Sequence, residues 1–140
     1  MDAPVENTEN SLKQVLLQAA EELYYPSESD EPFEYFEWEL GGSQPLDETQ
    51  VKRFTKKTRQ TPIETQSVDD FFKRVTEVKD WYHEDEIKQT EQFKALKEKI
   101  TANLTDVQVF RLGRTEIEAY IVGKTPSGKW AGLSTKLTET

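Results

Sequence analysis

The chain has no cysteine and a single histidine, His83, among its 140 residues. Disulfide bonds and thiolate chemistry are therefore excluded, which suits the cytoplasmic location that we expect. A metal cluster built on histidines and a His-assisted catalytic triad also lack their parts. No run of about 18 apolar residues occurs, and segment 1–10 is acidic and polar, so we expect neither a membrane span nor a signal peptide.

Recognisable catalytic motifs are missing as well. The sequence has no Gly-x-Ser-x-Gly motif, and Gly123-Lys124-Thr125 resembles the end of a phosphate-binding loop but has Glu118 where that loop requires glycine. Pairs of carboxylates occur, but 32% of the residues are charged, so a chance pair carries little meaning. We therefore expect a protein that is not an enzyme and that has no cofactor or metal of its own.

The net charge of −9 is unevenly distributed along the chain. Segment 1–99 contains 13 basic and 23 acidic residues, whereas segment 100–140 contains five and four. Segment 28–39 alone has six acidic residues and no basic one. This asymmetry disfavours nucleic acid as a direct ligand and favours a basic partner, although solubility is the more general reason for an acidic composition.

Three apolar runs near the C-terminus predict consecutive antiparallel strands, because each is rich in β-branched or aromatic residues. They are Val107–Leu112, Glu116–Gly123 and Trp130–Lys136. Gly113-Arg114 fits a two-residue hairpin that needs positive φ at glycine. Thr125-Pro126-Ser127-Gly128 fits a type I turn, with Pro at its second and Gly at its fourth position.

Both faces of these strands carry apolar side chains, so the sheet needs a cover on each face. A capping box at Ser11 predicts a helix from there to about Tyr24. Segment 46–63 is expected to be a short helix followed by a loop. Ser67 predicts another helix start, and three acidic residues from Glu84 to Glu86 begin a long helix that reaches about Asn103.

The remaining segments complete one domain. Phe33 to Glu39 alternates imperfectly between apolar and polar residues and is expected to be a fourth strand. Segment 1–10 is expected to be a mobile tail, and 11–140 a single domain. We expect a mixed α/β (α+β) domain around a mainly antiparallel sheet of about four strands.

Several segments resemble the nuclease A inhibitor family, from about Ser11 to Thr140. Their residues occur in the family's order: Ser27-Glu28-Ser29, Pro32-Phe33-Glu34, Phe71-Phe72, Arg74, Asp80-Trp81-Tyr82, Gln108-Val109, Arg111-Leu112-Gly113, and Gly123 to Thr140. Segment 41–66 departs from the family pattern. The resemblance implies a three-layer α/β/α sandwich of the PR-1-like kind.

The resemblance also implies a function. Such a protein inhibits a sugar-non-specific, Mg²⁺-dependent DNA/RNA endonuclease of the nuclease A (ββα-metal) type by blocking its active site. We expect a monomer that binds the nuclease one to one and that binds neither nucleic acid nor membranes. The alternative is an acidic protein-interaction domain that kept the fold and has lost or changed this partner.

The resemblance assigns nuclease binding to six residues: Glu28, Asp80, Trp81, Tyr82, Glu139 and Thr140. A carboxylate such as that of Glu28 is a hard ligand for Mg²⁺, and Thr140 would carry a carboxylate and a hydroxyl at the chain end. Trp81 is expected to fill a pocket of the partner. The alternatives are a solvated Glu28, a Trp81 packed into its own domain, and a frayed chain end.

Overall fold

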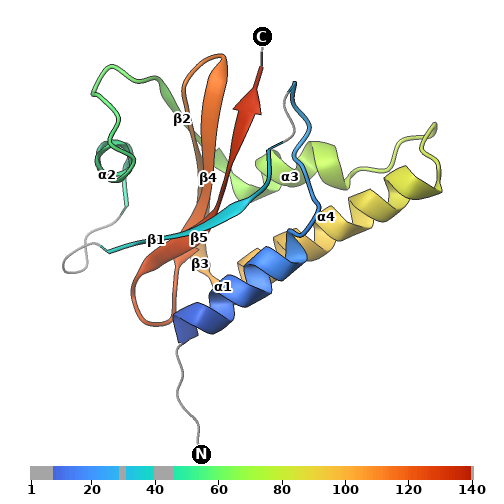
Figure 1. Ribbon diagram of the computed structural model, residues 1–140, viewed down its shortest axis with the longest axis horizontal. Coiled ribbons are helices and arrows are strands. Elements are labelled where there is room, and N and C mark those ends of the chain that lie inside the picture. The colour runs from blue at the N-terminus through green and yellow to red at the C-terminus, as the bar shows by residue number, and fades with distance from the viewer. Residues whose placement is uncertain (1–7, 29–30, 40–45, 140) are drawn as a thin grey trace, which may run out of the picture.

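The computed structural model describes residues 8–28, 31–39 and 46–139. Four helices and a five-stranded antiparallel sheet make up this part of the chain (Figure 1). In chain order the elements are α1 (Thr8–Ala19), β1 (Glu34–Trp38), α2 (Glu48–Phe54), β2 (Ile63–Ser67), α3 (Val68–Thr76), α4 (Glu84–Asn103), β3 (Thr105–Leu112), β4 (Glu116–Lys124) and β5 (Trp130–Thr138). The strand order in the sheet is β1-β5-β4-β3-β2.

The three predicted C-terminal strands are confirmed as β3, β4 and β5, and they form the centre of the sheet. The turn after β4 is closed by the Gly128 N–H, which donates to the Thr125 carbonyl at 2.9 Å. Gly113 has the expected positive φ, at 111°. The prediction of a two-residue hairpin is wrong, however, because Leu112 pairs with Glu118 and three residues separate the ends of β3 and β4.

One face of the sheet is covered by α1, α3 and α4, which Figure 1 shows together on one side. The core beneath them includes side chains with no exposed surface, among them Leu16, Phe71, Phe72 and Leu96. Ile117, Ala119 and Ile121 of β4 point into this core, as the strand alternation predicts. Each of these helices therefore packs an apolar stripe against the core.

The opposite face is covered by α2, a helix of seven residues. Its Phe54 stacks on Trp38 with ring centroids 5.0 Å apart, and Val51 is fully buried. Tyr120 and Val122 of β4 belong to this second cluster. The mixed α and β class and the antiparallel sheet are confirmed, while the PR-1-like three-layer classification stays a prediction.

Two boundaries at the N-terminal end differ from expectation. Helix α1 begins at Thr8, so the capping box at Ser11 is wrong and residues 8–10 belong to the helix instead of the tail. The helix ends at Ala19 instead of about Tyr24, and Glu22 adopts a left-handed φ of 61° just beyond it. Packing of Leu12 and Leu16 against the sheet holds this helix without the predicted cap. The rest of the expected tail, 1–7, lies outside the described residues.

A fifth strand, β2, begins at Ile63, where the expected loop ends, and covers residues for which the sequence predicted no strand. Its sequence, Ile-Glu-Thr-Gln-Ser, has little apolar alternation, and it forms an edge of the sheet by pairing with β3. The helix start after it is confirmed, because the Ser67 hydroxyl accepts a hydrogen bond from the Asp70 N–H at 3.0 Å. Pairing with an existing strand stabilises β2 more than its own residues do.

Candidate functional site

Tyr25 anchors the loop that carries Glu28. The Tyr25 side chain is 3% exposed, and its ring stacks on Phe71 with centroids 4.2 Å apart. Its hydroxyl donates to the Phe71 carbonyl oxygen at 2.6 Å. Burial raises the pKa of Tyr25, although the nearby guanidinium of Arg74 opposes this rise. The chain that leads to Glu28 therefore starts from a fixed point on α3.

Backbone contacts then join Glu28 to the end of β5. The Glu28 N–H donates to the Thr138 carbonyl at 2.9 Å, and the Thr138 N–H donates to Ser27 Oγ at 3.2 Å. Ser27 and Thr138 are far apart in the sequence, separated by 111 positions in residue number. The Glu28 side chain is exposed. A predicted site residue with an exposed side chain is thus held beside the C-terminal end of the sheet.

Glu139, the residue after β5, makes two contacts of its own. Its Oε1 lies 2.6 Å from Nη2 of Arg111, and its backbone N–H donates to the Thr115 carbonyl at 2.8 Å. The Glu139 side chain is 34% exposed. Thr140 lies outside the described residues, so its expected role stays a prediction. Glu139, the residue before Thr140, is anchored to β3 through Arg111 and to the β3–β4 loop through Thr115.

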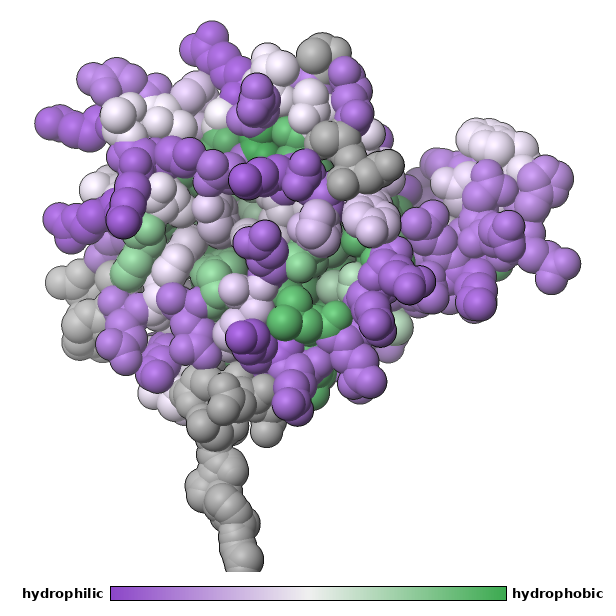
Figure 2. Space-filling model, viewed as in Figure 1, coloured by the Kyte–Doolittle hydropathy of each residue, from purple (hydrophilic) through white to green (hydrophobic). Residues whose placement is uncertain are grey.

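The loop between α3 and α4 presents the other three predicted residues. Trp81 is 69% exposed, and Asp80 is also exposed. Tyr82 is half-buried, its ring meets Trp81 edge to face at 6.1 Å, and its N–H donates to the Lys79 carbonyl at 3.1 Å. The alternative in which Trp81 packs into its own domain is therefore wrong. This end of α4 projects from a largely hydrophilic surface in Figure 2.

A small cavity lies between the Glu28 loop and the α3–α4 loop. Its volume is about 140 Å³, and Pro26 and Tyr82 both line it, with Val75 and Phe93 at its buried floor. Pro26 stands two positions before Glu28, and Tyr82 follows Trp81. The two loops therefore belong to one side of the molecule, the upper side in Figure 1, where the chain ends.

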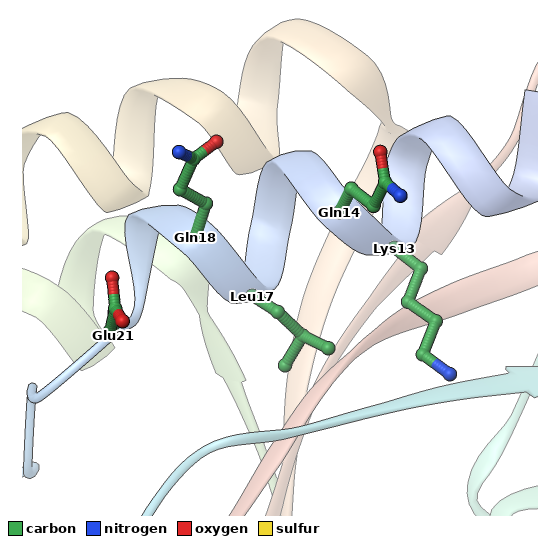
Figure 3. Close-up of a pocket in the computed structure, with 5 residues that line it drawn as sticks. All are labelled: Lys13, Gln14, Leu17, Gln18 and Glu21. Carbon is green, nitrogen blue, oxygen red and sulfur yellow. The ribbon is translucent and has the colours of Figure 1, made fainter.

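A wider hollow of about 750 Å³ lies along α1, but its side chains are not arranged to bind a ligand. Figure 3 shows Lys13 and Leu17 pointing towards β1, while Gln14 and Gln18 point to the other side of the helix. Side chains that bind one ligand converge on it, and these diverge. We therefore assign no function to this hollow.

A polar network on the α2 face connects the chain after α2 to the sheet. Glu118 Oε2 lies 2.7 Å from Lys57 Nζ, and the Tyr120 hydroxyl donates to Glu118 Oε1 at 2.7 Å. Burial would raise the pKa of Glu118, but the hydrogen bonds from Lys57 and Tyr120 outweigh burial and lower it. Burial and the Glu118 carboxylate raise the pKa of Tyr120 above its usual range. Because each group is satisfied by another, this network is structural.

Metal and membrane sites are not found in the part of the chain that the structure describes. Among residues 8–28, 31–39 and 46–139, no three His, Cys, Asp or Glu side chains are grouped to hold a metal ion. None of the described helices is long and apolar enough to cross a membrane.

Sequence reasoning missed the residues that hold the site together: Tyr25, Thr138 and, as an anchor, Arg111. A signal existed for Arg111, because it is the one basic residue in the apolar run from Val107 to Leu112. Thr138 gave no signal, since its role depends on backbone contacts between distant segments. The geometry unites Glu28 and Glu139, and it places Trp81 and Tyr82 on the same side of the molecule.

Comparison with known proteins gives one family. A family profile described as nuclease A inhibitor-like protein matches residues 10–140. No curated protein matches the chain. The matched range includes the Glu28 loop, the α3–α4 loop and the chain end.

Proposed function

Because this chain belongs to the nuclease A inhibitor-like family, we propose that it inhibits a sugar-non-specific, Mg²⁺-dependent DNA/RNA endonuclease of the ββα-metal type. The nuclease-binding face consists of Glu28, Asp80, Trp81, Tyr82, Glu139 and Thr140. One observation supports this face most directly: the hydrogen bonds between the Glu28 loop and Thr138 hold an exposed carboxylate beside the end of the chain.

Inhibition follows from what such a nuclease must offer its substrate. It binds phosphates with cationic groups and a metal ion, so an acidic protein surface can occupy the same groove. Glu28 approaches the Mg²⁺ directly or through water, and the Thr140 carboxylate and hydroxyl add two further hard oxygen donors. None of these groups is a scissile phosphodiester. The active site is therefore blocked without turnover.

Trp81 supplies the apolar part of the contact. It is 69% exposed, and its ring meets Tyr82, which is itself half-buried against the cavity. A large aromatic side chain that is already supported from behind loses little conformational entropy when it fills a pocket. Asp80 adds negative charge beside it, which suits a basic groove.

Further features of this protein belong to the same proposal, which rests on family membership. The protein is a monomer alone and forms a one-to-one complex with the nuclease. It acts in the cytoplasm, catalyses no reaction of its own, and contacts neither nucleic acid nor membranes directly. Its sheet and helices correspond to the PR-1-like three-layer sandwich.

The second candidate function is an acidic interaction domain with a different partner. It is favoured by the acidic balance of segment 1–99, which would attract any basic protein surface. Both candidates predict the fold and the exposed Trp81. They differ only in whether a nuclease is inhibited.

The test is a titration of the purified protein into a Mg²⁺-dependent ββα-metal nuclease, with digestion of plasmid DNA as the readout. We expect digestion to stop once the inhibitor equals the nuclease in concentration. A second arm replaces plasmid with RNA, which must be protected equally if the active site is blocked. Unchanged digestion at a large excess of folded protein would reject inhibition of this nuclease class and favour the interaction domain.

A further inference from the structure

Glu139, one of the six predicted nuclease-binding residues, forms an ion pair with Arg111, which is not among the six. We propose that this pair is a latch that holds the C-terminal end of β5 in its binding conformation before the nuclease arrives. Arg111 is then a positioning residue, and Glu139 acts by turning inward to Arg111. This inference rests on the proposed function, since it concerns the same face of the molecule.

The latch spans three strands. In the sheet order β4 lies between β3 and β5, so the Arg111 side chain has to cross β4 to reach Glu139. The residue directly opposite Arg111 on β4 is Ala119, whose short side chain leaves the path open. The guanidinium Nη2 then lies 2.6 Å from Glu139 Oε1. An arginine is long enough for this span and its planar group suits a carboxylate.

Burial separates this pair from an ordinary surface ion pair. The difference lies in the cation: the Arg111 side chain is 17% exposed, against 32% for Lys57 in its pair with Glu118, while the carboxylates Glu139 and Glu118 are 34% and 29% exposed. Exposed pairs contribute little because solvent screens them and both side chains lose freedom. A guanidinium that is already held by its surroundings loses less freedom, so it can fix the direction of a chain end.

Four contacts converge on the last two described residues, Thr138 and Glu139. Thr138 is hydrogen-bonded to Ser27 and Glu28 on one side, and the Glu139 N–H donates to the Thr115 carbonyl on the other. The ion pair to Arg111 completes this set. Chain ends are usually frayed, and a frayed end would have to be ordered when the nuclease binds. The latch removes that cost in advance and also steadies Glu28 through Thr138.

Electrostatics gives the opposite prediction, which makes the latch testable. Replacing Arg111 by glutamine makes an acidic inhibitor more acidic, and charge alone would then speed association with a basic nuclease. The latch predicts weaker inhibition, because the chain end and Glu28 lose their fixed direction. The two effects have opposite signs in the same variant.

The experiment compares Arg111→Gln, Glu139→Gln and the double variant with the full-length parent. We expect each single variant to weaken nuclease inhibition about three- to tenfold through lost preorganisation, and the double variant to be no weaker than the singles. Hydrogen exchange of the Thr138 and Glu139 amides in the free protein should become faster. The matched controls are Lys57→Gln and Glu118→Gln, which break an ion pair of 2.7 Å on the other face and should leave inhibition unchanged.

The outcomes separate the latch from the proposed function. Equal or tighter inhibition by Arg111→Gln, with unchanged amide exchange, would overturn the latch while the parent still inhibits. If the parent inhibits no nuclease, the proposed function fails, and amide exchange alone then decides whether Arg111 orders the chain end. Should Arg111→Gln lower the melting temperature, amide exchange of Thr138 and Glu139 in Glu139→Gln decides the comparison. This substitution leaves β3 intact, and amide exchange in the free protein does not depend on whether Glu139 also contacts the nuclease.

Discussion

At the scale of single residues, Glu28 combines an exposed carboxylate with a backbone fixed to Thr138. Glu28→Gln keeps the shape of the side chain and removes its charge, so it should weaken inhibition by about ten- to a hundredfold, the loss typical of a charge-assisted contact. The inhibition constant measured with plasmid DNA checks this. The control is Glu98→Gln, which removes the same charge from an exposed position near the C-terminal end of α4, away from the α3–α4 loop. It should leave the inhibition constant nearly unchanged. Equal effects of the two substitutions on the inhibition constant would show that Glu28 contributes only to the overall negative charge and does not contact the nuclease.

Gly132 shows how a single residue sets the centre of the sheet. A Cβ at this position would lie 1.7 Å from the Ile121 carbonyl oxygen, which is backbone and cannot move aside. Gly132→Ala should therefore lower the free energy of unfolding by more than about 3 kcal/mol, measured by urea denaturation. Gly128→Ala is the control, since open space surrounds it and only its φ of 92° opposes a side chain. That strain should cost about 1 kcal/mol, and similar losses in both variants would contradict the steric explanation.

At the scale of secondary-structure elements, the α3–α4 loop separates binding from stability. Trp81→Ala should weaken inhibition about thirtyfold or more, as loss of an aromatic anchor does, and leave the melting temperature nearly unchanged. Trp81→Phe should recover part of the loss. Val78→Ala is the matched control, because Val78 is another exposed apolar side chain of this loop. A large fall in melting temperature for Trp81→Ala would show that the ring supports its own domain.

The contact between the chain after α2 and the sheet should depend on pH. The folded protein lowers the pKa of Glu118 below its usual 4.5, so the folded state favours the charged form. This contribution is complete above the unfolded pKa and is lost as the pH falls through the folded pKa. The free energy of unfolding should therefore fall less steeply below about pH 4.5 in Glu118→Gln than in the parent, by urea denaturation. Parallel pH profiles for the two proteins would show that Lys57 does not stabilise the charged Glu118.

Elements with strong periodic patterns could be predicted from the sequence, and weak ones could not. The run from Glu116 to Gly123 has two apolar faces, and the structure confirms it as β4. Ser67 and the acidic run from Glu84 to Glu86 likewise predicted the starts of α3 and α4. Strand β2 was not predicted, because it is stabilised by its pairing with β3 and not by its own polar residues. The start of α1 was misplaced because packing of Leu12 and Leu16 outweighs a local cap.

At the scale of the whole molecule, the candidate site depends on contacts that no local pattern contains. The sequence and its family resemblance supplied the exposed groups, Glu28 and Trp81. The supports are long-range: Thr138 holds the Glu28 loop, Tyr25 ties that loop to α3, and Arg111 crosses a strand to Glu139. Such contacts follow from strand order and register, which single-sequence reasoning did not determine for β2.

The charges are also arranged at this scale. The acidic Glu28 loop, the end of β5 and the α3–α4 loop share one side of the molecule, whereas α2 and the segment after it carry Lys52, Arg53, Lys56, Lys57 and Arg59 on the opposite face of the sheet. If the proposed function holds, we expect a basic nuclease groove to meet complementary charge on one side and like charge on the other. Binding through the nuclease-binding face should leave the α2 face open to solvent.

Hydrogen exchange of the protein in the presence of a nuclease tests the central claim most directly. The exchange rates of backbone amides are compared with and without a catalytically inactive ββα-metal nuclease, peptide by peptide along this protein. We predict protection of the Glu28 loop, the α3–α4 loop around Trp81 and the end of β5, with unchanged exchange in α2 and β2. Protection centred on α2 or β2, with Trp81 still exchanging as in the free protein, would contradict the proposed nuclease-binding face.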